Sequence, residues 1–193
     1  MKKKGKIISF IIGCVLLFWV YKVIKVNNEV GITNKDYTMG EEIYNGNIKI
    51  VPMEAHIYTT DEYINHFNVE LDEYWLPDES TEYLIVCMKL QITNNGKNDV
   101  DWDVIISSLG YGFESDTWCS SIVPQLCAPI NCFSSDVLVV GESQELWLAT
   151  TVIKICFKDS TWKRIEQEQF YYVMETYPER KRIKLDFEYT GER

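Results

Sequence analysis

The first strong feature of the chain is an apolar segment near its N-terminus. No charged residue interrupts the 15 residues of segment 7–21, and extension to residue 26 gives 20 residues that include two Lys. About 20 mainly apolar residues are enough for a helix to cross the hydrocarbon core of a membrane, and Lys side chains near its end reach the interface. The pattern predicts that residues 1–26 form a signal anchor, with one transmembrane helix that contacts the membrane through residues 7–26.

Two other fates of this segment stay open. A cleaved signal peptide needs a pair of small residues at the cleavage site, and none follows the apolar run. Ile11-Ile12-Gly13-Cys14 resembles a site at which lipoproteins are cleaved and acylated on Cys. Apolar residues continue from Val15 to Val20, however, where a lipoprotein has a polar tether. The uncleaved anchor is therefore the preferred interpretation.

Positive charge before the apolar segment predicts its orientation. Lys2, Lys3, Lys4 and Lys6 precede it, and such flanks stay on the cytoplasmic side of a membrane. We therefore expect a single-pass protein of the cell membrane with a cytoplasmic N-terminus and an extracellular C-terminal domain.

After a polar tether at residues 27–46, alternation of apolar and polar residues predicts a β-rich domain over residues 47–193. One strand is expected at 47–58, with Pro52 at an edge or a bulge. Another is expected at 82–93, where both faces are partly apolar, as in a central strand. In the first strand, Val51, Met53, Ala55 and Ile57 are expected on the buried face. In the second, Leu84, Val86, Met88, Leu90 and Ile92 are expected on one face, and Tyr83, Ile85, Cys87, Lys89 and Gln91 on the other.

One short helix is expected from about Thr60 to Phe67, because Thr60 is a suitable N-cap and acidic residues follow it. Turn signals separate the other predicted strands. The sum predicts an all-β fold, an immunoglobulin-like antiparallel β-sandwich with one short helix, preceded by the transmembrane helix. The further strands lie at about 101–113, 137–140, 144–157, 170–176 and 183–189.

The distribution of charge limits the partners that the domain can bind. Six of the 19 basic residues and none of the 29 acidic residues lie in residues 1–26, so residues 27–193 carry a net charge of −16. A domain this acidic is repelled by phosphate backbones, and we expect no nucleic-acid partner. With 46% apolar residues, the chain can still build a substantial core.

A resemblance to known domains supports this interpretation. Residues 84–103 combine a hydrophobic strand with a Thr-Asn-Asn-Gly turn. This resembles families of unknown function whose members are membrane-anchored, immunoglobulin-like (telokin-like) extracellular domains of Gram-positive bacteria. Residues 37–42, 137–152 and 170–187 resemble the entry segment, a Gly-Glu-Ser strand and the closing hairpin of these domains. The resemblance implies the fold, the anchor and the compartment, and it implies no activity.

The cysteine-rich segment 119–132 departs from that resemblance. The domain after residue 26 holds five Cys, and an extracellular location permits disulfides. Cys127 and Cys132 are a candidate pair that closes a small loop, and Cys119 is a rival partner for either. Because five is odd, at least one thiol stays free or pairs with another chain.

The sequence contains few candidates for a metal site or a catalytic site. The two histidines, His56 and His66, have no neighbouring Cys for a metal site, and His56 is predicted to lie on the outward face of its strand. Asp101 and Asp103 lack the rest of a calcium loop. We expect no catalytic residue, no metal and no cofactor.

A binding function is favoured by aromatic residues in predicted loops and strands. Trp75, Trp118, Tyr171 and Tyr172 are of the type that often mediates recognition. We therefore expect a protein-interaction or ligand-binding module rather than an enzyme, with an unknown protein partner. An envelope enzyme or redox protein that uses the loop cysteines is one alternative. A structural accessory subunit of a membrane complex is another.

Overall fold

The computed structural model describes residues 2–30, 33–71, 77 and 80–187, and at the N-terminus it describes side chains only from residue 12 to residue 26. The chain divides into two compact units, Met1–Thr33 and Asn34–Arg193. Each unit is described by itself.

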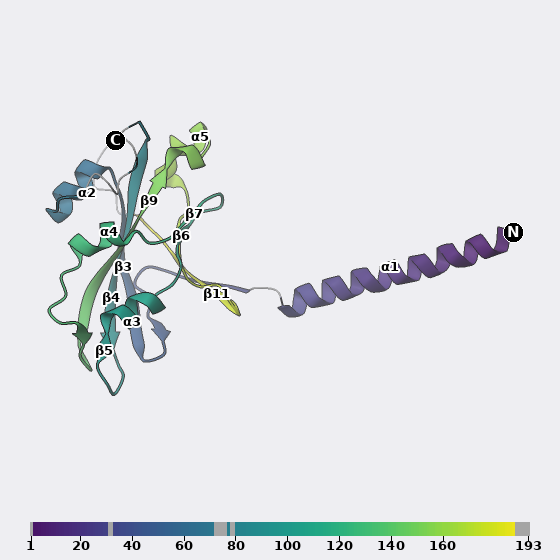
Figure 1. Ribbon diagram of the computed structural model, residues 1–193, viewed down its shortest axis with the longest axis horizontal. Helices are drawn as coiled ribbons and strands as arrows, with labels where there is room; N and C mark the ends of the chain where they lie inside the picture. The colour runs from purple at the N-terminus through teal and green to yellow at the C-terminus, as the bar shows by residue number, and fades with distance from the viewer. Residues whose placement is uncertain (1, 31–32, 72–76, 78–79, 188–193) are drawn as a thin grey trace. The chain divides into compact units, whose positions relative to one another are not determined.

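The first unit consists of one continuous helix, α1 (Lys2–Val30), shown in purple in Figure 1. The predicted N-terminal segment is therefore helical. Within the residues that the structure describes, no helix has both the length and the apolar character of a membrane span.

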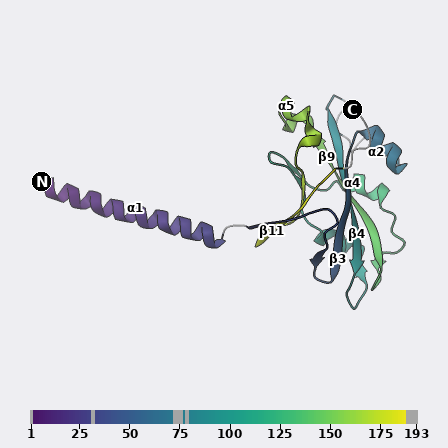
Figure 2. The ribbon, with the colours of Figure 1, turned by 180° about the vertical axis from the view of Figure 1, so that it is seen from behind.

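The second unit contains a four-stranded antiparallel sheet in the order β2 (Ile43–Asn45), β3 (Ile48–Tyr58), β4 (Tyr83–Asn94) and β9 (Ser143–Ile153). Strand β4 pairs with β3 on one side and with β9 on the other, and Figure 2 shows the three strands from behind. The prediction of a central strand at 82–93 is confirmed. The five residues expected to share one face of it all lie in the main core.

A five-stranded sheet has the order β1 (Thr33–Tyr37), β11 (Glu179–Lys184), β10 (Tyr171–Glu175), β6 (Gly112–Glu114) and β7 (Cys119–Ser120). Strand β10 is antiparallel to β11 and to β6. The short strands β5 (Val100–Asp101) and β8 (Val137–Leu138) form a third sheet.

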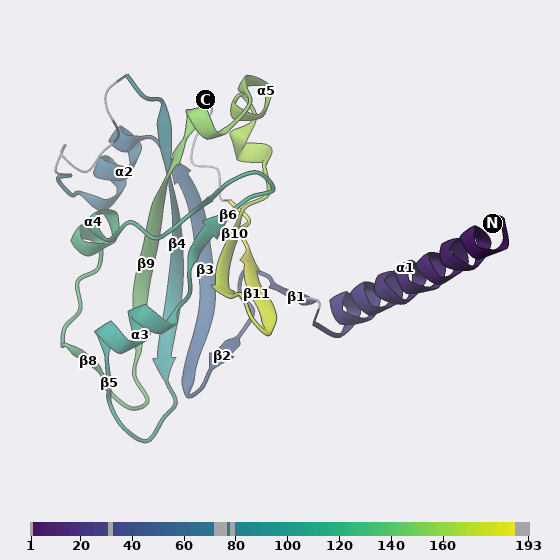
Figure 3. The same cartoon turned by 45° about the vertical axis from the view of Figure 1, so that its right-hand side comes forward.

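The two larger sheets share one hydrophobic core, and Figure 3 shows β6, β10 and β11 on one side of the long strands. The two larger sheets therefore lie against each other across this core. The core includes Ile50, Leu90 and Leu148 from one sheet and Phe113, Tyr172 and Ile183 from the other.

A smaller core covers the other face of the four-stranded sheet beneath α2 (Thr60–Phe67) and α4 (Pro124–Cys127). Tyr63 of α2 is fully buried there, and its hydroxyl donates a hydrogen bond to the Leu126 carbonyl at 2.7 Å. Because these helices cover the face, His56 is only 4% exposed. Its predicted outward position is wrong in this respect.

A β-bulge in β3 explains why part of its predicted inward face is wrong. The pairing of β3 with β4 shifts register between Pro52 and Glu54, as the bulge prediction for Pro52 anticipated. The extra residue, Met53, is 47% exposed, whereas Ile50 before the bulge is fully buried. A bulge adds one residue and so reverses the alternation of the two faces.

Helix α2 confirms the predicted short helix but moves its cap by one residue. Thr59 is the N-cap, and its hydroxyl accepts a hydrogen bond from the Glu62 backbone N–H at 3.3 Å. The Glu62 carboxylate accepts from the Thr59 backbone N–H at 2.7 Å. This reciprocal capping box fixes the start of the helix, and Asn68 ends it with a φ of 52°.

The strand predicted at 101–113 is wrong, because residues Trp102–Ser108 form helix α3. Trp102, Ile105 and Leu109 are buried, whereas Val104 is 56% exposed. Spacings of three and four residues between buried positions belong to a helix rather than to a strand. The alternation of Val104 and Ile106 therefore misled the prediction.

The domain holds more helix than predicted, so an all-β class with one short helix is wrong. Its described residues include α2, α3, α4 and α5 (Asp159–Trp162), and 3₁₀ turns at Ala128–Ile130, Lys154–Cys156 and Ile165–Gln167. With α1, the described residues form five α-helices and three open sheets, a mixed α/β arrangement. Part of the segment predicted as a tether, residues 33–45, contributes β1 and β2 to the two larger sheets.

Side chains close the outer edge of β9. The Trp147 backbone N–H donates to Asn131 Oδ1 at 2.7 Å, and Asn131 Nδ2 donates to the Trp147 carbonyl at 2.8 Å. Asn131 Nδ2 also donates to the Cys127 carbonyl at 2.8 Å. The amide thus takes the place of a neighbouring strand and protects an edge that is open to other chains.

Candidate functional site

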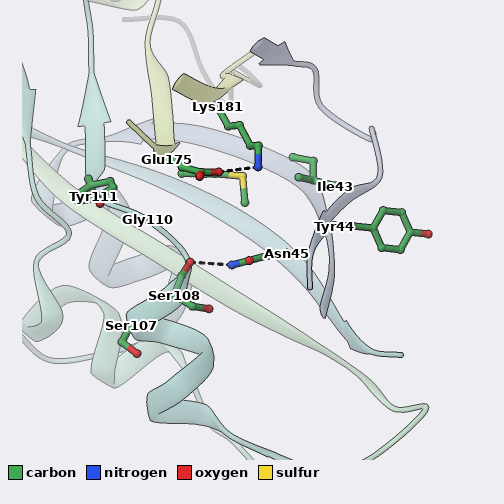
Figure 4. Close-up of a pocket in the computed structure, with 10 residues that line it drawn as sticks. Ile43, Tyr44, Asn45, Ser107, Ser108, Gly110, Tyr111, Glu175 and Lys181 are labelled. Carbon is green, nitrogen blue, oxygen red and sulfur yellow. Dashed lines mark hydrogen bonds and ion pairs between the residues drawn. The ribbon is translucent and has the colours of Figure 1, made fainter. Parts of the chain in front are cut away.

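A polar pocket of about 360 Å³ lies where three segments that are distant in sequence meet. One segment is β2, the second is the end of α3 with its link to β6, and the third is the hairpin of β10 and β11, as Figure 4 shows. Known ligand pockets begin at about 300 Å³. The lining residues are Ile43, Tyr44, Asn45, Ser107, Ser108, Gly110, Tyr111, Met174, Glu175 and Lys181.

Gly110 lets the α3–β6 link lie directly against β10. Its φ is +137°, and a Cβ there would overlap the Val173 carbonyl oxygen and lie 2.6 Å from Met174 Cα. The Tyr111 backbone N–H donates to the same Val173 carbonyl at 2.9 Å. Only glycine fits this close approach, which brings the end of α3 to the β10–β11 hairpin.

The two serine hydroxyls at the end of α3 donate hydrogen bonds to backbone carbonyls of the same helix. Ser107 Oγ donates to the Val104 carbonyl at 3.0 Å, and Ser108 Oγ donates to the Ile105 carbonyl at 2.8 Å. A serine oxygen that donates once still has lone pairs that accept. Both hydroxyls therefore act mainly as acceptors toward the pocket.

The β2 side of the pocket is held to α3 by an amide. Asn45 Nδ2 donates to the Ser108 carbonyl at 3.0 Å, the contact drawn in Figure 4. Tyr44 is turned away from the other lining side chains, and its hydroxyl donates to Glu42 at 3.0 Å. Asn45 rather than Tyr44 thus supplies the polar group on this side.

An ion pair forms the wall on the β10–β11 hairpin. Lys181 Nζ lies 2.6 Å from Glu175 Oε2, and the two side chains are 30% and 39% exposed. The hydrogen bond to Glu175 raises the pKa of Lys181 above its ordinary value. Lys181 is therefore a cation at physiological pH, held beside the Glu175 carboxylate.

The cysteines named in the sequence do not meet at this pocket. All six lie in the described part of the chain and are free, with Cys119 and Cys132 exposed. Burial raises the pKa of Cys127 to about 12, and its Sγ accepts a hydrogen bond from the Ala149 N–H at 3.2 Å. Burial also raises the pKa of Cys87. The pairing of Cys127 with Cys132 or Cys119 stays a prediction.

The aromatic residues expected to mediate recognition have other positions. Trp118 is 8% exposed and Tyr172 is fully buried, so both fill the main core. Tyr171 is half-buried beneath the Arg182 guanidinium, 4.1 Å from the centre of its ring. Trp75 lies outside the described residues.

Both histidines belong to one aromatic cluster, His56 from β3 and His66 from α2, with ring centres 6.0 Å apart. His56 Nε2 lies 3.1 Å from Glu54, which also pairs with Lys89 at 3.0 Å. Burial raises the pKa of Glu54, but hydrogen bonds with His56 and Lys89 outweigh burial and hold this pKa below its ordinary value. Among the described residues, no three His, Cys, Asp or Glu side chains are grouped as metal ligands.

Asp101 and Asp103, the weak calcium candidates, line a separate hollow of about 550 Å³ together with Asp136. A stacked pair, Trp102 and Phe133, borders this hollow, with ring centres 4.1 Å apart. The two aspartates therefore lie away from the polar pocket.

None of the pocket residues was singled out by the sequence. The three segments come together only in the folded domain, and none of them carries a recognisable binding motif by itself. The available signal was the run Leu109-Gly110-Tyr111-Gly112, in which two glycines lie within four residues beside a helix end. Such glycines often mark close backbone approach.

Comparisons with known proteins place the chain in a family. No curated protein matches it. The crystal structure of a conserved hypothetical protein from Bacillus anthracis is similar, with a TM-score of 0.45 and 8% sequence identity over 74% of this chain and 92% of that chain. That likeness is too distant to support an argument about function. A family model described as Domain of unknown function (DUF5028) matches residues 34–181, most of the chain, and the chain therefore belongs to this family.

Proposed function

We propose that the domain is a binding module, and that the polar pocket is its site. The observation that carries this proposal is the convergence of β2, α3 and the β10–β11 hairpin on one hollow whose serine hydroxyl oxygens can still accept hydrogen bonds. Pockets that combine shape with a few convergent polar groups are the usual sites of ligand binding.

The proposal places this module outside the cell, held by residues 7–26. Its support is the apolar run flanked by Lys, together with the helical conformation of Lys2–Val30. Of segment 7–26, the structure describes the side chains of residues 12–26. The acidic domain suits a position away from an anionic membrane surface, because like charges repel.

We also propose that the two stacked sheets form an immunoglobulin-like sandwich of the telokin-like type. Support comes from the antiparallel pairing of the long strands β3, β4 and β9 and from the core that both sheets share.

Among the loop cysteines of the redox alternative, Cys127 gives it the least support. Burial raises its pKa to about 12. A reactive thiol needs a lowered pKa, since the thiolate is the nucleophile. The accessory-subunit alternative has no comparable observation in its favour.

Capture with a blocked pocket tests the binding proposal. The full chain in detergent, the variant Ser107→Trp and the control Ser160→Trp are immobilised and exposed to solubilised membranes and to culture medium. Both serines are exposed and lie on helices, but only Ser107 lines the pocket. We expect a molecule that the wild type and Ser160→Trp retain and Ser107→Trp loses. Identical retention by all three proteins contradicts the proposal.

Protease shaving of whole cells tests the compartment. An extracellular domain is degraded by added protease while a cytoplasmic marker stays intact. A domain that survives in intact cells and is degraded after lysis contradicts the proposed location.

A further inference from the structure

The remaining hydrogen-bonding capacity of the polar pocket indicates the chemistry of its ligand. The hydroxyl protons of Ser107 and Ser108 are used within α3, at 3.0 and 2.8 Å. Asn45 Nδ2 donates to the Ser108 carbonyl at 3.0 Å, which leaves Asn45 Oδ1 as an acceptor. The Glu175 carboxylate has a second oxygen beyond the one paired with Lys181. Acceptors therefore dominate what the pocket can offer.

Lys181, the cation among the described lining residues, does not reverse this balance. Lys181 Nζ is 2.6 Å from Glu175 Oε2, so an anion that approached Lys181 would also meet the Glu175 carboxylate. The domain beyond residue 26 carries a net charge of −16, which repels anions and attracts cations at longer range. A cation that approached Glu175 would likewise meet Lys181, so the ion pair favours neither sign and the negative charge of the domain decides in favour of a cation.

An aromatic side chain completes the environment. Tyr111 lines the pocket and is 64% exposed. Faces of aromatic rings attract organic cations, and guanidinium and ammonium groups supply several N–H donors in a small volume.

We propose that this pocket binds an organic cation with N–H donors, a guanidinium or a primary ammonium, of the kind carried by Arg and Lys side chains. The proposal rests on the proposed binding function of the same pocket and names its ligand class. The cation donates to Glu175, to Asn45 Oδ1 and to the serine hydroxyl oxygens, and its charge is balanced by the acidic domain.

A set of matched probes tests the ligand class. The full chain in detergent is titrated with Nα-acetyl-arginine amide, Nα-acetyl-lysine amide, putrescine, the neutral Nα-acetyl-glutamine amide and the anionic Nα-acetyl-glutamate amide, and binding is followed by ligand-observed NMR. We expect saturable binding of cationic probes, weakened by added salt, and no binding of the glutamate probe. Preference for the two amino-acid amides over putrescine assigns the cation to a peptide side chain, and the opposite order assigns it to a free amine.

Two variants with the same charge change locate the interaction. Glu175→Gln removes the carboxylate that lines the pocket, and Glu179→Gln removes a nearby carboxylate on β11 that does not line it. Loss of a hydrogen bond to a charged group should weaken cation binding about tenfold in Glu175→Gln. The control Glu179→Gln should change it less than about twofold, because it alters only the long-range field.

The outcomes separate this inference from the proposed function. Equal effects of the two variants, or stronger binding of the glutamate or glutamine probe than of the cations, overturn the inference. A pocket that binds none of the cationic probes also overturns it, and the Ser107→Trp capture experiment then decides independently whether the pocket is a binding site.

Discussion

Replacing Gly110 by alanine should destabilise the domain far more than the same change at Gly141. Both glycines have positive φ, +137° and +80°. At Gly141 nothing lies within 4 Å of the added Cβ, so only the backbone conformation is unfavourable, by about 1–2 kcal/mol. At Gly110 the Cβ also overlaps the Val173 carbonyl oxygen and lies 2.6 Å from Met174 Cα.

The expected magnitude follows from two separate costs at Gly110. The strained backbone contributes about 1–3 kcal/mol, and separation of the α3–β6 link from β10 contributes about 1–3 kcal/mol, as in other overpacked sites. We expect Gly110→Ala to lower the free energy of unfolding by about 2–6 kcal/mol. A domain typically has about 5–15 kcal/mol in total, so the loss is large but measurable.

Urea unfolding of the full chain in detergent, followed by tryptophan fluorescence, measures both variants under the same conditions. The six Trp residues provide the signal. A loss in Gly110→Ala no larger than that in Gly141→Ala refutes the reasoning, because it shows that the link does not depend on close approach to β10. Failure to recover folded Gly110→Ala, with normal recovery of Gly141→Ala, supports it.

Three further outcomes are expected. Asn131→Ala should lower the free energy of unfolding by about 2–3 kcal/mol, since backbone groups of β9 lose their partners; urea unfolding measures it, and a loss below about 0.5 kcal/mol contradicts the edge role. Because the pKa of Glu54 is lowered in the folded domain, its ionised form stabilises the fold at pH values above the ordinary pKa of a glutamate. This stabilisation is lost as pH falls through the lowered pKa. Glu54→Gln should therefore unfold with a smaller loss of stability between neutral and acidic pH, and an unchanged pH profile contradicts this. Under native conditions, maleimide labelling with mass spectrometry should modify exposed Cys156 quickly and Cys87 and Cys127 slowly; equal rates contradict the burial argument.

The sequence predicted best where local pattern and burial agree. Strand β4 faces the main core along its length and the smaller core through Ile85 and Cys87, and its central place was evident because both faces are partly apolar. The short helix α2 was predicted from polar capping residues, and its N-cap differed by one position. Family membership agrees with the inferred resemblance to domains of unknown function, whereas the telokin-like type stays a proposal.

Prediction failed where two periodicities fit the same residues. In Trp102–Ser108, Trp102, Val104 and Ile106 alternate as in a strand, while Trp102, Ile105 and Leu109 recur as in a helix. Burial decides between the two patterns, and burial depends on what packs against the segment. The main core accepts the side of α3 formed by Trp102, Ile105 and Leu109, so the local sequence alone was insufficient.

The pocket was beyond prediction for a related reason. Asn45, Ser108 and Glu175 come from three distant parts of the chain. Asn45 belongs to β2, Ser108 ends α3 and Glu175 ends β10, and none of these elements is unusual by itself. Their meeting depends on one close approach, which Gly110 permits. The assembly of the site therefore depends on Gly110, which has no side chain. An analysis of polar and apolar positions does not identify such a residue. If the pocket binds a cation, the glycine determines whether the acceptors assemble, and Glu175 determines how strongly they bind.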